Sequence, residues 1–225
     1  MKKYIGIIVA EVQEMEAIKE LMSNVHKISI YNLQIFKGKI SKKNCLLVRS
    51  GVGKANAART TQVLTDRFEL EHIINLGSAG ALNDNLNIGD IVIGEKLVQH
   101  DFDVTAFGRE KGCIPDTGKF FKSDRELIKK YQSIEIANQK VFTGIIASGD
   151  IFCTDIQMKE RIREKFNADC VEMEGAAIAQ VCSLNSIPFI VIRSISDTPN
   201  GKNQIDFNEY LKIASKNCAE FIKGL

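Results

Sequence analysis

Acidic side chains at the starts of predicted helices are the first candidates for chemistry in this chain. Glu172 and Glu174 flank one methionine in the segment 171–175, which precedes the apolar run 176–182. A carboxylate there either accepts hydrogen bonds from two vicinal sugar hydroxyls or complements the positive end of a helix dipole. Glu14 follows the first apolar run, where it is either a general base or an ordinary helix-surface residue.

A second group of polar residues follows a buried apolar run near the C-terminus. Arg193 and Asp197 come directly after the run 188–192. Polar side chains at the end of a buried strand in an α/β protein are placed for a ligand site, although a structural Arg–Asp ion pair also fits. Phe152 follows the sequence SGDI and is either a stacking platform for an aromatic base or part of the core.

Two glycine-containing segments each follow a predicted strand. The sequence GVGKAN at 51–56 resembles half of a dinucleotide fingerprint, but Asn56 replaces the third glycine. We therefore expect a tight strand-to-helix turn there and no nucleotide cofactor. The sequence GSAG at 77–80 predicts a turn, either an ordinary one or one that brings backbone N–H groups and the Ser78 hydroxyl close to a ligand.

Length and composition fit a single α/β domain over 1–225. Hydrophobic residues make up 44% of the chain and the net charge is +2, so we expect a folded core and no nucleic-acid partner. The longest apolar runs, about six to eight residues, are too short to cross a bilayer. The run 5–9 meets Glu11 and Glu14 without a small-residue cleavage site, which indicates a first strand and not a signal peptide.

Cysteine and histidine usage points to a cytoplasmic protein. The six cysteines form no C-x-x-C pair, and the three histidines are scattered. This pattern favours reduced core thiols over disulfides or a zinc site. We therefore expect no metal ion.

Strand-like and helix-like segments alternate along the chain. Alternation of this kind predicts a mainly parallel sheet covered by helices on both faces. Capping boxes predict helix starts at Ser123, Thr154 and Asp206. The segment 103–121 is a long loop, which is usually a lid, an interface or disordered. Short apolar runs predict buried strands at 5–9, 45–48, 73–76, 91–93, 141–147 and 189–192, with a hairpin over 28–40.

Taken in order, the motifs of this chain resemble the nucleoside phosphorylase superfamily, and most closely the bacterial 5'-methylthioadenosine/S-adenosylhomocysteine nucleosidases. The resemblance implies a three-layer αβα sandwich around a mixed, partly barrel-like sheet, and a homodimer. It also implies hydrolysis of the N-glycosidic bond without cofactor or metal. The motifs are SGVGKANAA (50–58), NLGSAGAL (75–82), IGDIVIGE (88–95), HDFDVTAFG (100–108), SGDIF (148–152), VEMEGAAIAQVC (171–182) and PFIVIRSISD (188–197).

The resemblance implies roles for individual residues. Asp197 would be the general acid that protonates N7 of adenine, and Glu14 the general base for water. Glu174 would bind the ribose hydroxyls, with Met173 lining the sugar. Ser78 and Arg193 would surround the attacking water, and Phe152 and Cys153 would contact adenine. Val52, Val104 and Phe207 would line the pocket for the 5'-substituent, to which the partner subunit would add Phe107 and Pro115. Glu172 and Ser196 complete the set of expected substrate-binding residues.

The N-terminal loop bears on the choice between water and phosphate as nucleophile. Phosphorolytic relatives place glycine and arginine there to hold the anion, whereas 9–14 has no arginine and two acids. A carboxylate in that space repels phosphate and polarises water. The family commonly has Gly-Ala-Met where this chain has VAE at 9–11, so the 5'-substituent stays unassigned. The alternatives are a purine nucleoside phosphorylase and a non-catalytic nucleoside-binding protein on the same fold.

Overall fold

The computed structural model describes residues 3–136, 139–198 and 207–223, with the backbone alone described for 207–210. Within these ranges the helices are α1 (Val12–Lys19), α2 (Lys54–Arg67), α3 (Arg125–Gln132), α4 (Ile156–Phe166), α5 (Gly175–Leu184) and α6 (Phe207–Ile222), with a 3₁₀ turn η1 (Thr105–Phe107). The strands are β1 (Tyr4–Val9), β2 (Ser23–Ile30), β3 (Leu33–Ile40), β4 (Lys43–Arg49), β5 (Leu70–Ala81), β6 (Ile91–Gln99), β7 (Phe121–Lys122), β8 (Val141–Ser148), β9 (Cys170–Glu172) and β10 (Phe189–Asp197).

The strands form a ten-stranded mixed sheet in the described part of the chain. β5 pairs in parallel with both β1 and β10, and antiparallel with β9. The pairings β9–β8, β8–β6 and β6–β10 then lead back to β5 and close a ring. The flanking strands β4, β3 and β2 extend from β1 as an open edge. The expected mixed, partly barrel-like sheet is confirmed.

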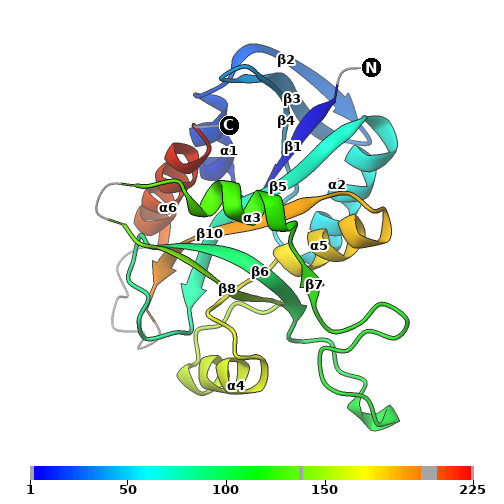
Figure 1. Ribbon diagram of the computed structural model, residues 1–225, viewed down its shortest axis with the longest axis vertical. Helices are drawn as coiled ribbons and strands as arrows, with labels where there is room; N and C mark the ends of the chain where they lie inside the picture. Colours follow the sequence, from blue (N-terminus) through cyan, green and yellow to red (C-terminus); the bar gives the residue numbers. More distant parts are fainter. Residues whose placement is uncertain (1–2, 137–138, 199–206, 224–225) are drawn as a thin grey trace.

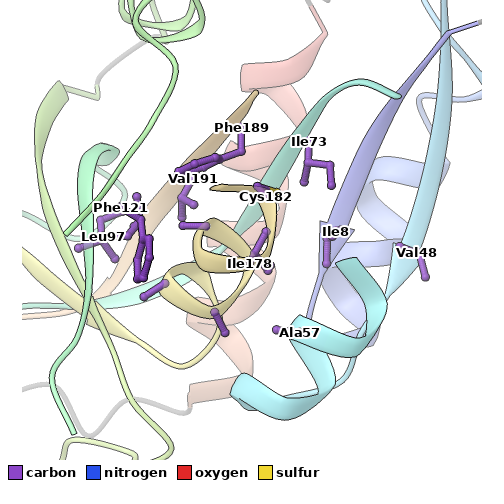
Figure 2. Close-up of a cluster of buried hydrophobic side chains, with 14 of the residues drawn as sticks. Ile8, Val48, Ala57, Ile73, Leu97, Phe121, Ile178, Cys182, Phe189 and Val191 are labelled. Carbon is purple, nitrogen blue, oxygen red and sulfur yellow. The ribbon is translucent and has the colours of Figure 1, made fainter. Parts of the chain in front are cut away.

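Helices cover the sheet from two sides (Figure 1). α1 packs against α6, and α2 packs against α5. Each pair closes its own core: Ile18 and Phe221 belong to one hydrophobic cluster, and Leu64 and Ile178 to the other. Figure 2 shows the second cluster between α2, α5 and the strands. Among the described residues, no helix is both long and apolar enough to span a membrane.

Several strands run further than their apolar stretches predict, and β5, β6 and β10 do so by the most. β5 continues through 77–80, so the expected turn at the GSAG sequence is wrong. That stretch pairs along β10, its last residue also pairs with β9, and the Ser78 N–H donates to the Glu14 carboxylate. These partners keep it in a strand even though glycine disfavours strands. β10 likewise continues to Asp197, which places Arg193 inside the strand and not at its end.

The helix starts differ from the predicted capping boxes by one residue. Asp124 caps α3, accepting hydrogen bonds from two backbone N–H groups, whereas Ser123 is buried. Asp155 caps α4 in the place expected for Thr154. Aspartate accepts such hydrogen bonds at least as well as serine or threonine, so in both helices the adjacent aspartate occupies the N-cap position. The box predicted at Asp206 lies outside the described residues.

Candidate active site

A cavity of about 350 Å³ lies at the carboxyl ends of β1, β5 and β10. Parallel strands that end together are the usual place for a ligand in α/β proteins. Most of the predicted site residues line this cavity. They are Glu14, Val52, Ser78, Phe152, Cys153, Glu172, Met173, Glu174, Arg193, Ser196 and Asp197.

Three predicted residues of the long loop do not line the cavity of their own chain. Val104 is half-buried, Pro115 is exposed, and Phe107 is 84% exposed on η1. The loop projects away from the body of the molecule (Figure 1). Of Phe207 only the backbone at the start of α6 is described, so its predicted role lies outside the described side chains.

Glu14 is held at the start of α1 with its carboxylate turned into the protein. One oxygen accepts hydrogen bonds from the backbone N–H groups of Ala10 and Glu11, both at 3.0 Å, and the other from that of Ser78 at 3.1 Å. Burial raises the pKa of Glu14, against the opposing effect of these hydrogen bonds and of Arg193. Ser78 thus acts on the carboxylate through its backbone. Glu14 is not the exposed helix residue that was its alternative interpretation.

Two glycines of β5 make room for the two candidate catalytic carboxylates. A β-carbon on Gly77 would lie 3.0 Å from Oε1 of Glu14, and one on Gly80 would lie 3.0 Å from Oδ1 of Asp197. Either contact is tighter than ordinary packing allows. The GSAG sequence therefore brings the backbone close to the two acids and does not form a turn. Three residues of strand span about 10 Å, which is enough to keep the two carboxylates apart.

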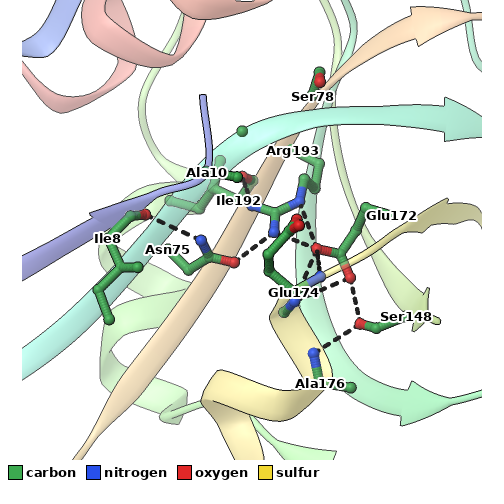
Figure 3. A network of polar contacts seen from close by, with 12 residues as sticks. Ile8, Ala10, Asn75, Ser78, Ser148, Glu172, Glu174, Ala176, Ile192 and Arg193 are labelled. Carbon is green, nitrogen blue, oxygen red and sulfur yellow. Dashed lines mark hydrogen bonds and ion pairs between the residues drawn. The ribbon is translucent and has the colours of Figure 1, made fainter. Parts of the chain in front are cut away.

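Arg193 and Glu172 form a buried ion pair beneath the cavity (Figure 3). The Arg193 guanidinium also donates to the side-chain oxygen of Asn75. The Glu172 carboxylate accepts from Ser148 and from the backbone N–H of Gly175 at the start of α5. Burial alone would raise the pKa of Glu172, but Arg193 and these hydrogen bonds lower it overall. Glu172 thus accepts hydrogen bonds at the N-terminus of α5, which is the structural role that the sequence offered as an alternative. Its contact with substrate remains a prediction.

Asn75 and Ser148 belong to this network but were missed in the sequence. Asn75 donates to the carbonyl of Ile8 at 3.0 Å, which ties β5 to β1. It interrupts an otherwise apolar run, and a polar residue in such a run was the available signal. Ser148 ends β8 and donates to Glu172 while accepting from the Ala176 N–H at 2.7 Å.

Glu174 faces the cavity from the N-terminal end of α5. Its Oε1 accepts a hydrogen bond from the Gly53 N–H at 2.8 Å, so the GVGKAN turn supports this carboxyl group. Burial, and then the charge of Glu172, raise the pKa of Glu174 to about 8, against the opposing effect of Arg193. Below that pH the group carries a proton, so it can both donate to and accept from a ligand's hydroxyl groups.

Asp197 ends β10 at an irregularity in the sheet. Ile195 pairs with Ala79 and Asp197 with Gly80, so Ser196 is an extra residue on β10. Bulges of this kind redirect side chains and are frequent beside active sites. The Ser196 hydroxyl donates to Oδ1 of Asp197 at 3.1 Å. Lys159 contacts the other carboxylate oxygen, a partner that the sequence did not indicate.

A polar network fixes the loop that carries Phe152. The Lys54 ammonium lies 2.6 Å from Oδ1 of Asp101, and Oδ2 of Asp101 accepts from the Asp150 backbone N–H at 2.9 Å. Asp150 in turn accepts from the Lys54 backbone N–H at 2.8 Å. These contacts join the turn containing Val52 to the loop containing Phe152, on two sides of the cavity.

The cavity is suited to cleaving a glycosidic bond to an aromatic base. Five acidic residues line it, and among them Glu14 and Asp197 lie on separate elements and are each seated against a glycine of β5. Phe152, which is 62% exposed, offers an aromatic side chain in the lining of the same cavity. Most enzymes that hydrolyse glycosidic bonds use two carboxyl groups that flank the substrate.

The family model described as the phosphorylase superfamily matches residues 4–225, so the chain belongs to that superfamily. The comparisons with individual proteins narrow the assignment. The chain is 40% identical over 223 residues to a 5'-methylthioadenosine/S-adenosylhomocysteine nucleosidase of Staphylococcus haemolyticus, covering 98% of each chain. The chain belongs to this nucleosidase family.

Solved structures agree with this assignment. A nucleosidase of the same name from Neisseria meningitidis, in complex with methylthio-immucillin-A, has a TM-score of 0.93 and 39% identity, covering 98% of this chain and 97% of that one. Futalosine hydrolase of Helicobacter pylori has a TM-score of 0.90 and 32% identity, covering 98% of this chain and 96% of that one. The same fold therefore serves enzymes named for different nucleoside substrates.

Proposed function

We propose that this chain hydrolyses 5'-methylthioadenosine and S-adenosylhomocysteine to adenine and the corresponding thioribose. The observation that carries the proposal is the placement of Glu14 and Asp197 in one cavity, each seated against a glycine of β5. The names of the relatives point to the same substrates. The reaction removes by-products of S-adenosylmethionine use and serves methionine salvage.

The two carboxyl groups divide the chemistry between them. Asp197 protonates N7 of adenine, because adenine leaves far more readily as a neutral base than as an anion. The ribosyl carbon gains oxocarbenium character, and Glu14 takes a proton from the water that attacks it. This is the inverting form of two-carboxylate catalysis. Each acid or base contributes about 10²–10⁴-fold, so positioning and charge stabilisation supply the remainder.

The remaining cavity residues bind the nucleoside. Glu174 accepts hydrogen bonds from the ribose hydroxyls, and Met173 lies along the sugar. Arg193 acts on the attacking water indirectly, through its charge near the Glu14 carboxylate. Phe152 stacks on adenine while the backbone of Cys153 contacts its edge. Val52 and Val104, with Phe207, line the 5'-substituent pocket. All six cysteines are free thiols, which supports our placement of the enzyme in the cytoplasm.

The test of the proposed function is adenine release in phosphate-free buffer. The substrates are methylthioadenosine, adenosylhomocysteine, 5'-deoxyadenosine and aminodeoxyfutalosine, compared by kcat/KM. The last is included because a futalosine hydrolase shares 32% identity and the fold. Highest kcat/KM with the thio-substituted adenosines supports the proposal, and failure to cleave either of them contradicts it. A marked preference for the futalosine would make that hydrolysis the function.

Hydrolysis should need neither metal nor phosphate. The sequence places no arginine in the N-terminal loop 9–14, and Glu14, which lines the cavity, would repel an attacking anion. Turnover should therefore be unchanged by a chelator and by added phosphate, and the sugar product should be the free thioribose. A rate that collapses with chelator, or a ribose-1-phosphate product, would contradict this prediction and favour a phosphorylase.

We also propose a homodimer in which the long loop completes the partner's site. Phe107, which is 84% exposed, and Pro115 lie outside the cavity of their own chain, on a loop that projects from the molecule, so a partner subunit is the surface that they would contact. Phe107→Ala should raise KM for methylthioadenosine by about tenfold but leave KM for adenosine nearly unchanged, because burial of a methylthio group is worth about 1–2 kcal/mol. Steady-state kinetics on both substrates give the comparison.

Sedimentation tests the dimer independently of that variant. The wild-type protein at micromolar concentration should sediment as a dimer, and dilution to monomer should abolish turnover. A monomer with full activity would rule out the shared site, and the loop would then be a lid within one subunit.

A further inference from the structure

Glu11 is an acid in the lining of the cavity that the proposed reaction does not use. It is the N-cap residue of α1 and is half-buried. Of the two residues of this loop that differ from Gly-Ala-Met, Val9 is fully buried in the core, whereas Glu11 reaches the cavity. Glu11 is therefore the difference that changes the chemistry of the cavity wall.

Glu11 lies at the opposite end of the cavity from the proposed acid. Along the sheet, β5 lies between β10 and β1, and β4 follows β1. Asp197 ends β10, whereas Glu11 follows β1 and Val52 follows β4. The Ser50 backbone N–H donates to the Val9 carbonyl at 2.8 Å, which holds these two loops side by side. Neighbouring strands are about 4.8 Å apart, so β10 and β4 are separated by about 14 Å along the sheet.

The order of the groups along the cavity places the 5'-substituent beside Glu11. In the proposed reaction adenine takes the end that contains Asp197, and the ribose lies between Glu14 and Glu174. The base and the 5'-carbon leave the ribose ring from its two sides, so the 5'-substituent points toward the loops that carry Glu11 and Val52. Glu11 thus lines the wall that this substituent meets.

The charges of the cavity favour a cation at this end. No described residue forms an ion pair with Glu11. Arg193 is the one cation among the described residues of the lining, and it is paired with Glu172. Helix capping does not account for the residue, because glutamate is not among the favoured N-cap residues. An unpaired carboxylate attracts an ammonium group and repels another carboxylate.

We propose that Glu11 is a specificity-determining residue, which makes the enzyme favour adenosines whose 5'-thio substituent carries an ammonium group over those with an uncharged substituent of the same size. The inference rests on the proposed function. S-adenosylhomocysteine carries such an ammonium group, together with a carboxylate that Glu11 repels. Substrates with a single charge therefore isolate the effect.

The experiment compares kcat/KM for adenosines with three 5'-thio substituents of similar length. The 3-aminopropyl group is a cation, the butyl group is neutral, and the 2-carboxyethyl group is an anion. The wild type should prefer them in that order. Glu11→Gln removes the charge and keeps the shape, so it should lower the ratio of the aminopropyl to the butyl value by about tenfold. It should also raise the ratio of the carboxyethyl to the butyl value.

The ratios, and not the absolute rates, are the measurement, because a weakened start of α1 would lower all three rates together. If the Gln variant does not fold, Glu11→Met removes the charge with a side chain of similar size and should lower the aminopropyl ratio in the same way. Glu20→Gln is the matched control, because Glu20 is an exposed glutamate at the C-terminal end of the same helix. It changes the net charge equally and should leave both ratios as in the wild type.

Two results with the variants would overturn the inference. An aminopropyl ratio that Glu11→Gln leaves unchanged would make Glu11 a helix cap alone. An equal fall in Glu20→Gln would mean that the preference reflects the net charge of the protein. A wild type that cleaves the butyl compound but gains nothing from the ammonium would also overturn the inference, while leaving the proposed function intact. Absence of adenine release from every thioadenosine would instead contradict the proposed function itself.

Discussion

Asp197→Asn should lower kcat for methylthioadenosine by at least about 10³-fold while weakening purine binding much less. Asparagine keeps the shape of the side chain and can still donate a hydrogen bond to N7, but it has no proton to transfer. Adenine would then have to leave as an anion. Single-turnover kinetics would give the chemical step, and calorimetry with adenine would give the binding.

The substitution also removes the partner of Lys159, so stability must be measured alongside. Loss of one member of a fully buried pair costs about 3–5 kcal/mol, and only part of that applies because the Asp197 side chain is 39% exposed. The double variant Lys159→Gln/Asp197→Asn removes the pair together and should recover the stability but not the activity. Asp84→Asn, which breaks an exposed pair between Asp84 and Arg163 of α4, is the control. Activity within about tenfold of wild type in folded Asp197→Asn would show that another group is the acid.

Much of the fold could be predicted because its signals are local. Short apolar runs located most of the long strands, and the alternation of strands with helices indicated a sheet covered on both faces. Where a strand continues into polar residues, the apolar run ends before the strand does, so the predicted strand is too short. Arg193 sits inside β10 because Glu172 and Asn75 supply it with partners from other elements. No local pattern reports such partners.

The candidate site shows the same division between local and distant information. Glu172 and Glu174 were recognisable because two acids precede an apolar helix. Lys159 looked like one of several charged residues on an amphipathic helix, and its contact with Asp197 joins residues 38 positions apart. Gly77 likewise predicted a turn when read locally, whereas in the structure its missing side chain leaves room for the carboxylate of Glu14, which lies far from it in the sequence.

Glu14→Gln should lower kcat by about 10²–10⁴-fold and leave KM nearly unchanged, because it removes the base that activates water but not the contacts to the nucleoside. A binding or crystallographic experiment should then find intact substrate in the site. The variant has a structural cost, since Glu14 accepts from three backbone N–H groups and the glutamine NH₂ would face at least one of them. An unmade buried hydrogen bond costs about 1–3 kcal/mol, so thermal unfolding must accompany the kinetics.

The pH profile separates a catalytic role of Glu14 from a structural one. Burial raises the pKa of Glu14, and a base acts only when it is ionised. Wild-type kcat/KM should therefore fall as the pH drops through that raised pKa, and this acid limb should be absent from the residual activity of Glu14→Gln. Glu16→Gln, an exposed glutamate on the same helix, should keep the limb and the full rate. If Glu14→Gln turns over normally, or keeps the acid limb, the base is another residue, and Glu11 is the next acid that lines the cavity.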